Sequence, residues 1–63
     1  MVYDLFELSY PARMKIFLRL GLVQDEDVDV SDAERVRRAL SRAREDDKLE
    51  ALRSELKIEL GKK

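Results

Sequence analysis

The stretch that decides the fold runs over residues 9–22 and reads "SYPARMKIFLRLGL". Pro11 suits the first position of a helix, where its missing backbone N–H costs nothing. Gly21 suits the left-handed position just past a helix end, and Leu22 can then fold back as an apolar contact. Between these signals apolar residues cover more than half of the helix circumference, which is typical of a helix buried on several sides. We therefore predict that residues 11–20 form the central helix of the fold.

A short apolar stretch over residues 2–8 precedes this helix. Its apolar and acidic residues fall on opposite sides of a helix, which predicts one or two helical turns. An isolated helix of this length would not hold in water, so we expect it to dock on the rest of the chain.

The second half of the chain holds two helical patterns that differ in phase. Residues 31–34 have the spacing of a capping box, which predicts a helix start. Its apolar stripe then loses phase, and a new stripe begins at Leu49 behind a second cap-like residue, Asp47. We predict a tight break beside Asp47, and the alternative is one long kinked helix over residues 32–60.

These patterns predict an all-α fold. A chain of 63 residues allows one domain. A domain of this size buries only about 60% of its unfolded surface, so it needs very regular helix packing or a partner. We expect a single small helical domain over residues 1–63, built as a compact bundle of about four helices over residues 2–8, 11–20, 32–45 and 48–60.

The composition argues against an enzyme and against a membrane protein. The chain has no Cys and no His, so its serines lack the usual activating base and the usual soft metal ligands are missing. Four short helices also leave little room for a ligand pocket of several hundred Å³. No apolar run approaches the ~20 residues of a membrane span, and the lack of Cys fits the reducing cytoplasm. We expect a cytoplasmic protein that is not an enzyme, needs no cofactor and has no membrane partner.

Opposite charges are separated along the chain. Residues 1–32 carry a net charge of −4 and residues 33–63 a net charge of +3, although the total is only −1. Complementary patches of this kind steer association and set its specificity. We therefore predict two protein-interaction patches: an acidic patch of Asp25, Glu26, Asp27 and Asp29, and a basic patch of Arg35, Arg38 and Arg42.

The acidic connector, residues 23–30, has other interpretations. Asp25, Asp27 and Asp29 have the spacing of an EF-hand calcium loop, but valines stand where that loop requires a Gly and a bidentate Glu. We therefore predict no metal site. A solvated acidic loop that ends in a helix cap remains an alternative to a docking surface.

The arginine-rich stretch 35–44 also has two functional interpretations. It either binds an acidic protein surface or contacts nucleic acid, and a solvated helix face is the structural alternative. The chain is not basic overall, and the carboxylates that flank the arginines would repel phosphates. We expect a protein partner, and we keep a small nucleic-acid-binding transcriptional regulator as the alternative function.

The order of three segments resembles the small effector-associated or death-like adaptor domains of bacteria. The segments are "YPARMKIFLRLGL" (residues 10–22), "DAERVRRALSRARE" (residues 32–45) and "DKLEALRSEL" (residues 47–56). The resemblance implies a compact all-α module that pairs with a like domain and tethers effectors such as peptidases or NTPases in bacterial signalling or immunity. It agrees with the function predicted from the charges: a non-enzymatic adaptor that pairs with a second copy, as a homo-oligomer, or with a related helical domain.

Overall fold

Four α-helices and one short 3-10 helix account for most of the described residues, 2–62, in the computed structural model of the chain, and these residues form no strand. Met1 and Lys63 lie outside the described residues. The all-α fold of about four helices is thereby confirmed. The bounds are Val2–Glu7 for α1, Tyr10–Arg19 for α2, Asp25–Asp27 for the 3-10 helix η1, Asp32–Glu45 for α3 and Leu49–Gly61 for α4.

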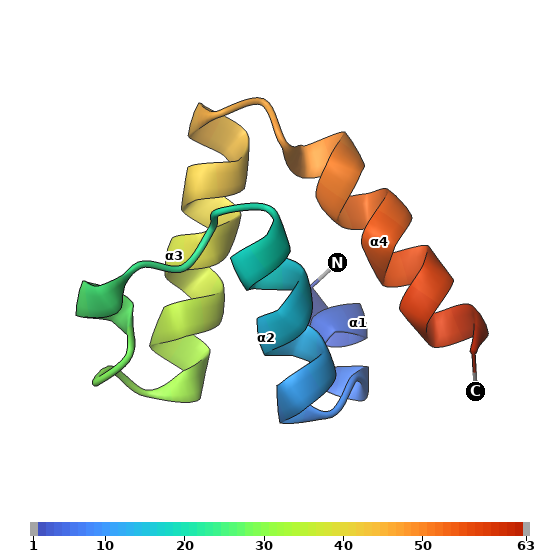
Figure 1. Cartoon of the computed structure of the whole chain (residues 1–63), viewed down its shortest axis with the longest axis horizontal. Helices are drawn as coiled ribbons and strands as arrows, with labels where there is room; N and C mark the ends of the chain where they lie inside the picture. The colour runs from blue at the N-terminus through green and yellow to red at the C-terminus, as the bar shows by residue number, and fades with distance from the viewer. Residues whose placement is uncertain (1, 63) are drawn as a thin grey trace.

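The helices enclose a single apolar core. In Figure 1, α3 and α4 meet at a short turn and splay apart, with α2 in front of the space between them and α1 behind α2. The α4 helix packs on the other three helices, and α1 also packs on α2. None of the helices in the described part is long and apolar enough to cross a membrane. The buried apolar side chains are Leu5, Leu8, Ile16, Phe17, Leu22, Val23, Val36, Ala39, Leu40, Ala43, Leu52 and Leu56.

The α2 helix begins one residue earlier than predicted. The Ser9 hydroxyl accepts a hydrogen bond from the Ala12 N–H at 3.4 Å and so caps the helix, and Pro11 follows Tyr10 in the first turn. The C-terminal prediction is confirmed, because Gly21 has a φ of +70° and the Leu22 N–H reaches the carbonyl of Phe17 at 2.8 Å. This is the Schellman pattern, in which a left-handed residue lets the next N–H satisfy a free helix carbonyl.

Only part of the apolar stripe predicted on α2 is buried. Ile16 and Phe17 are fully enclosed, whereas Leu18 is 61% exposed. The sequence pattern overestimated the burial of α2. In Figure 1 α3 and α4 splay apart, and α2 lies in front of the space between them, so these two helices do not enclose it. The helix packs on α1 and α4, but it is α4 that packs on all three other helices.

The predicted start of α3 is confirmed, but only one of the two hydrogen bonds of a capping box forms. The Ser31 hydroxyl accepts a hydrogen bond from the Glu34 N–H at 3.2 Å. The Glu34 carboxylate does not return to Ser31, as a capping box would require, because it binds Arg37 and Arg38 instead. The electrostatic attraction of two guanidinium groups outweighs one backbone N–H.

The predicted break between α3 and α4 is present, but its chemistry differs from the prediction. Asp47 does not cap α4; it adopts a left-handed φ of +58° after the end of α3. The next N–H, of Lys48, then binds the Ala43 carbonyl at 2.7 Å, so Asp47 occupies the position that usually holds Gly. The ammonium of Lys48 also binds the carbonyl of Leu20 at 2.8 Å, which ties the turn to the end of α2.

Arg13 is a buried charge that the sequence did not reveal. Its guanidinium donates to the carbonyls of Leu5 at 3.1 Å and Leu8 at 3.0 Å, and it forms an ion pair with Asp32. It also lies over the ring of Phe6, with 5.0 Å from its central carbon to the ring centre. One side chain therefore fixes the end of α1 to α2 and to the start of α3.

The left-handed backbone of Asp47 predicts that glycine at this position would stabilise the fold. Asp47→Gly removes a steric cost of about 1 kcal/mol, partly offset by the greater freedom of Gly in the unfolded chain, so we expect a gain of about 0.5–1 kcal/mol. For a domain of this size this corresponds to roughly 2–8 °C in Tm, measured by circular dichroism. Asp46→Gly is the matched control: Asp46 has an ordinary φ of −95°, and this change should not raise the Tm. An equal gain from both variants would contradict the assignment.

Candidate functional site

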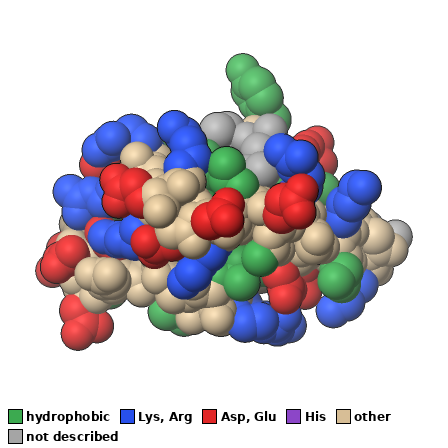
Figure 2. Space-filling model, turned by 90° about the horizontal axis from the view of Figure 1, so that it is seen from above, with side chains coloured by type: hydrophobic (Ala, Val, Ile, Leu, Met, Phe, Trp, Pro, Cys, Tyr) green, Lys and Arg blue, Asp and Glu red, His purple; other side chains and the backbone are tan. Residues whose placement is uncertain are grey.

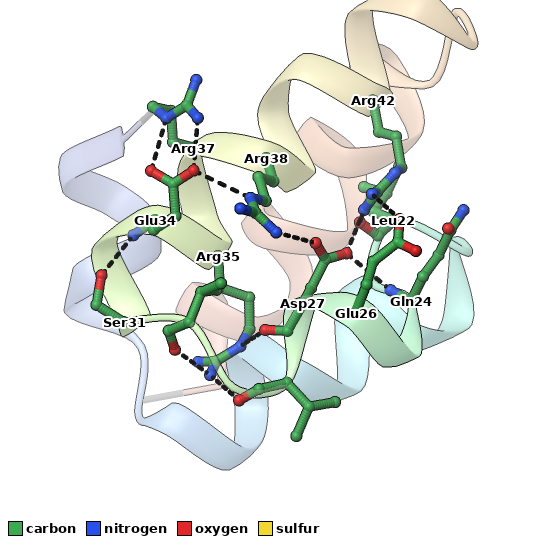
Figure 3. A network of polar contacts seen from close by, with 12 residues as sticks. Leu22, Gln24, Glu26, Asp27, Ser31, Glu34, Arg35, Arg37, Arg38 and Arg42 are labelled. Carbon is green, nitrogen blue, oxygen red and sulfur yellow. Dashed lines mark hydrogen bonds and ion pairs between the residues drawn. The ribbon is translucent and has the colours of Figure 1, made fainter.

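The acidic connector is attached to α3 by the carboxylate of Asp27, which is completely buried. One carboxylate oxygen accepts from Arg42 at 2.5 Å and from the backbone N–H of Gln24 at 2.9 Å, and the other accepts from Arg38 at 3.1 Å. Figure 3 shows the two guanidinium groups reaching Asp27 from α3. Arg42 also donates to the carbonyl of Leu22 at 2.7 Å, so one side chain holds both the start and the middle of the connector.

Arg35 holds the other side of the connector. It is buried, and it donates to the carbonyls of Asp27 at 3.0 Å, Val28 at 2.9 Å and Val30 at 2.9 Å. A guanidinium group offers five donors in a fixed plane, so it can satisfy several loop carbonyls that have no helical partner. The connector is therefore held rigidly, although it has little regular secondary structure.

The network lowers the pKa of two carboxylates. The hydrogen bond from Arg42, followed by those from Gln24 and Arg38, holds the pKa of Asp27 well below its usual range, although burial acts in the opposite direction. Hydrogen bonds from Arg37 and then Arg38 lower the pKa of Glu34 to about 2. Both groups therefore stay ionised at neutral pH, and the network remains intact there.

The predicted patches do not lie apart as two free surfaces. Of the acidic set, Asp25, Glu26 and Asp29 are exposed, while Asp27 is buried between two members of the basic set. The ion pairs between the two sets are Asp27 with Arg38, Asp27 with Arg42, and Glu26 with Arg42 at 3.7 Å, and Arg35 binds the backbone carbonyl of Asp27. Opposite charges that are separated along the sequence thus meet within one molecule, and their role in binding a partner remains a prediction.

The basic set differs in exposure. The Arg35 side chain is 7% exposed, that of Arg42 20% and that of Arg38 36%. Arg37 is exposed and pairs with Glu34, and Arg44 forms no ion pair among the described residues. The alternative of a nucleic-acid-binding helix is weakened, because four of the five arginines, all but Arg44, already bind groups of the same chain.

A groove that the sequence did not predict lies between α1 and α3. Phe6, Val36 and Leu40 line its apolar part, and Arg37 and Arg44 stand at its edge. Apolar and positive residues on α3 recur at three- and four-residue spacing on this side, but nothing in the sequence places α1 beside them. On the face shown in Figure 2, positive and negative side chains are mixed, with small hydrophobic areas between them.

The carboxylates of the connector do not converge on a common point. Asp27 points into the protein, while Asp25 and Asp29 are exposed. In the described part of the chain, no group of three or more acidic side chains is placed to hold a metal ion. The chemistry that the surface offers is charge pairing and apolar contact.

The fold is a small all-α domain whose described surface offers mixed charges and an apolar groove. The sequence profile of the GTPase-associated adaptor domain family matches residues 1–57. The chain therefore belongs to the GTPase-associated adaptor domain family, which confirms the prediction of a small adaptor domain. No curated protein and no solved structure matches the chain significantly.

The buried position of Asp27 predicts a large loss of stability in Asp27→Asn. The substitution leaves two guanidinium groups without their shared anion, and breaking a buried ion pair from one side is strongly destabilising. We expect the Tm to fall by about 10 °C or more, measured by thermal denaturation. Asp29→Asn is the matched control, because Asp29 is exposed and makes no ion pair among the described residues. Equal Tm values for the two variants would contradict the structural role of Asp27.

The lowered pKa of Asp27 also predicts how stability depends on pH. The unfolded value is about 3.9, so ionised Asp27 stabilises the fold fully above about pH 5, and this contribution is lost as the pH falls toward the lower native value. We expect the Tm of the parent chain to fall more steeply below about pH 4 than that of Asp27→Asn. Parallel acid profiles, followed by circular dichroism, would show that Asp27 carries no such linkage.

Proposed function

We propose that this chain is a non-enzymatic adaptor, acting in bacterial signalling or immunity in the cytoplasm, that pairs with a second copy or with a related helical domain. The family is described as GTPase-associated, so the pairing would bring a GTPase and its effector into one assembly. The match over residues 1–57 is the observation that carries the proposal.

The connector supplies the surface that supports this role. Asp25, Glu26 and Asp29 are exposed on a backbone that buried side chains hold in place. A rigid charged surface loses little conformational entropy on binding, so more of its contact energy becomes affinity. In this proposal the three exposed carboxylates meet a basic surface of the partner.

The other predicted patch residues have a supporting part in the same proposal. Asp27 and Arg35 position the connector, and the partly exposed Arg38 and Arg42 add positive charge beside it. The substitutions that test binding should therefore fall on exposed residues, because changes at Asp27 or Arg35 would also alter the fold.

The proposal predicts association that weakens as salt rises. Exposed charges are screened beyond about 10 Å at 0.1 M ionic strength and beyond about 3 Å at 1 M. Sedimentation equilibrium would be run on the chain alone, and titration calorimetry on the chain with a GTPase-bearing protein of its host that carries a related helical domain. We expect binding in at least one experiment at about 0.1 M salt and a clear loss at about 1 M.

The double variant Asp25→Lys with Asp29→Lys should weaken this binding, and Glu50→Lys, on the exposed surface of α4, is the matched control. No association in either experiment at protein concentrations of about 1 mM would overturn the proposal, since even a weak contact of about −4 kcal/mol is half formed there.

A further inference from the structure

The groove between α1 and α3 is open because α1 packs on α2 and α4. Its volume is about 270 Å³, and its lining is mainly apolar, with Phe6 on one side and Val36 and Leu40 on the other. Small-molecule sites usually measure about 300–1,000 Å³ and enclose their ligand. An open groove below that range suits the side chain of a protein partner better than a free ligand.

The edge of the groove is positively charged. Arg37 pairs with Glu34 but is 68% exposed, and Arg44 has no ion pair among the described residues. Arg37 binds Glu34 through Nε and Nη2, which leaves Nη1 to donate to a further carboxylate. An occupant that presents an apolar side chain among carboxylates would complement both parts of the groove.

The acidic connector presents that combination. Val28 is 58% exposed, and the neighbouring Asp25 and Asp29 are exposed and make no ion pair among the described residues. Glu26 is 70% exposed and only 3.7 Å from Arg42. Arg35 binds the carbonyl of Val28, so this valine is held outward on a fixed backbone.

The two surfaces lie on opposite sides of α3. At 100° per residue, Arg35, Arg38 and Arg42, which hold the connector, share one side of the helix. By the same rule Leu40 and Arg44 lie about 180° from that side. A molecule cannot bring its own connector into its own groove, but it can use both surfaces at once with two neighbours.

We propose that the Val28 tip of one copy, with Asp25 and Asp29, docks in the α1–α3 groove of a second copy, beside its Arg37 and Arg44. The contact is head-to-tail, so each added copy leaves one groove and one tip free. Such a heterologous contact produces an open chain or a ring, whereas an isologous contact would stop at a dimer. This inference rests on the proposed pairing function and assigns it a surface and a direction.

The test uses two variants that block opposite ends. Arg44→Glu reverses a charge beside the groove and should block it. Asp29→Lys reverses a charge beside Val28 and should block the tip. Each variant keeps the other surface intact. Sedimentation equilibrium at about 0.1 M salt should show the average mass of the parent chain rising with concentration beyond a dimer. Each variant alone should stay at the monomer mass of 7.4 kDa. An equal mixture should assemble at least to a dimer, because the groove of Asp29→Lys accepts the tip of Arg44→Glu.

Two matched controls and a second pair of variants keep the test decisive. Arg53→Glu and Glu50→Lys change exposed charges on α4 that form no ion pair among the described residues, and both should assemble like the parent chain. Arg44→Gln removes the charge without placing a negative group near the end of α3, and Val28→Ser removes the apolar tip without changing charge. Both should weaken assembly, with helicity by circular dichroism unchanged.

The other outcomes overturn the inference. These are a mixture that stays monomeric, an Arg44→Glu protein that still assembles, or an Arg53→Glu protein that loses assembly equally. A parent chain that is monomeric at all concentrations also overturns it. In that case, binding to a related domain in the calorimetric titration would leave the proposed adaptor function standing.

Discussion

The ionised carboxylate of Asp27 determines where the connector lies, and much of the surface depends on that position. No other described side chain between Gln24 and Val30 is buried, so apolar packing cannot fix this segment. Two arginines of α3 and the N–H of Gln24 bind the carboxylate instead. Desolvating one charge is tolerated because the surrounding donors replace its water. The position of Val28 and of the exposed carboxylates follows from this arrangement.

Most of the fold could be predicted from local signals. The cap at Ser31, the left-handed Gly21 and the change of apolar phase before Leu49 each report a property of a few neighbouring residues. The predictions were wrong where one residue could take either of two local conformations. Asp47 has the chemistry of an N-cap, but it takes the left-handed position after α3 because the Lys48 N–H then satisfies a helix carbonyl.

The candidate site could be predicted only in part. The sequence singled out charged residues of the connector and of α3 but placed them on separate surfaces, because charge separation along a chain says nothing about distances after folding. The contacts of Asp27 with Arg38 and Arg42 span 11 and 15 positions, beyond the reach of helical spacing rules. The groove needed still more information, since Phe6 and Leu40 come together only through the packing of α1 on α2 and α4.

The hydrogen bonds of Arg13 limit which residues this position can hold as the sequence diverges. Its guanidinium donates hydrogen bonds to the carbonyls of Leu5 and Leu8 and, at the same time, binds the carboxylate of Asp32. A lysine keeps the charge but concentrates it in one compact ammonium group, which lacks the planar spread of donors that reaches all three. Exposed pairs such as Arg19 with Glu55 carry no such geometric demand. Related chains should therefore vary freely at residues like Arg19 while retaining arginine at the position of Arg13.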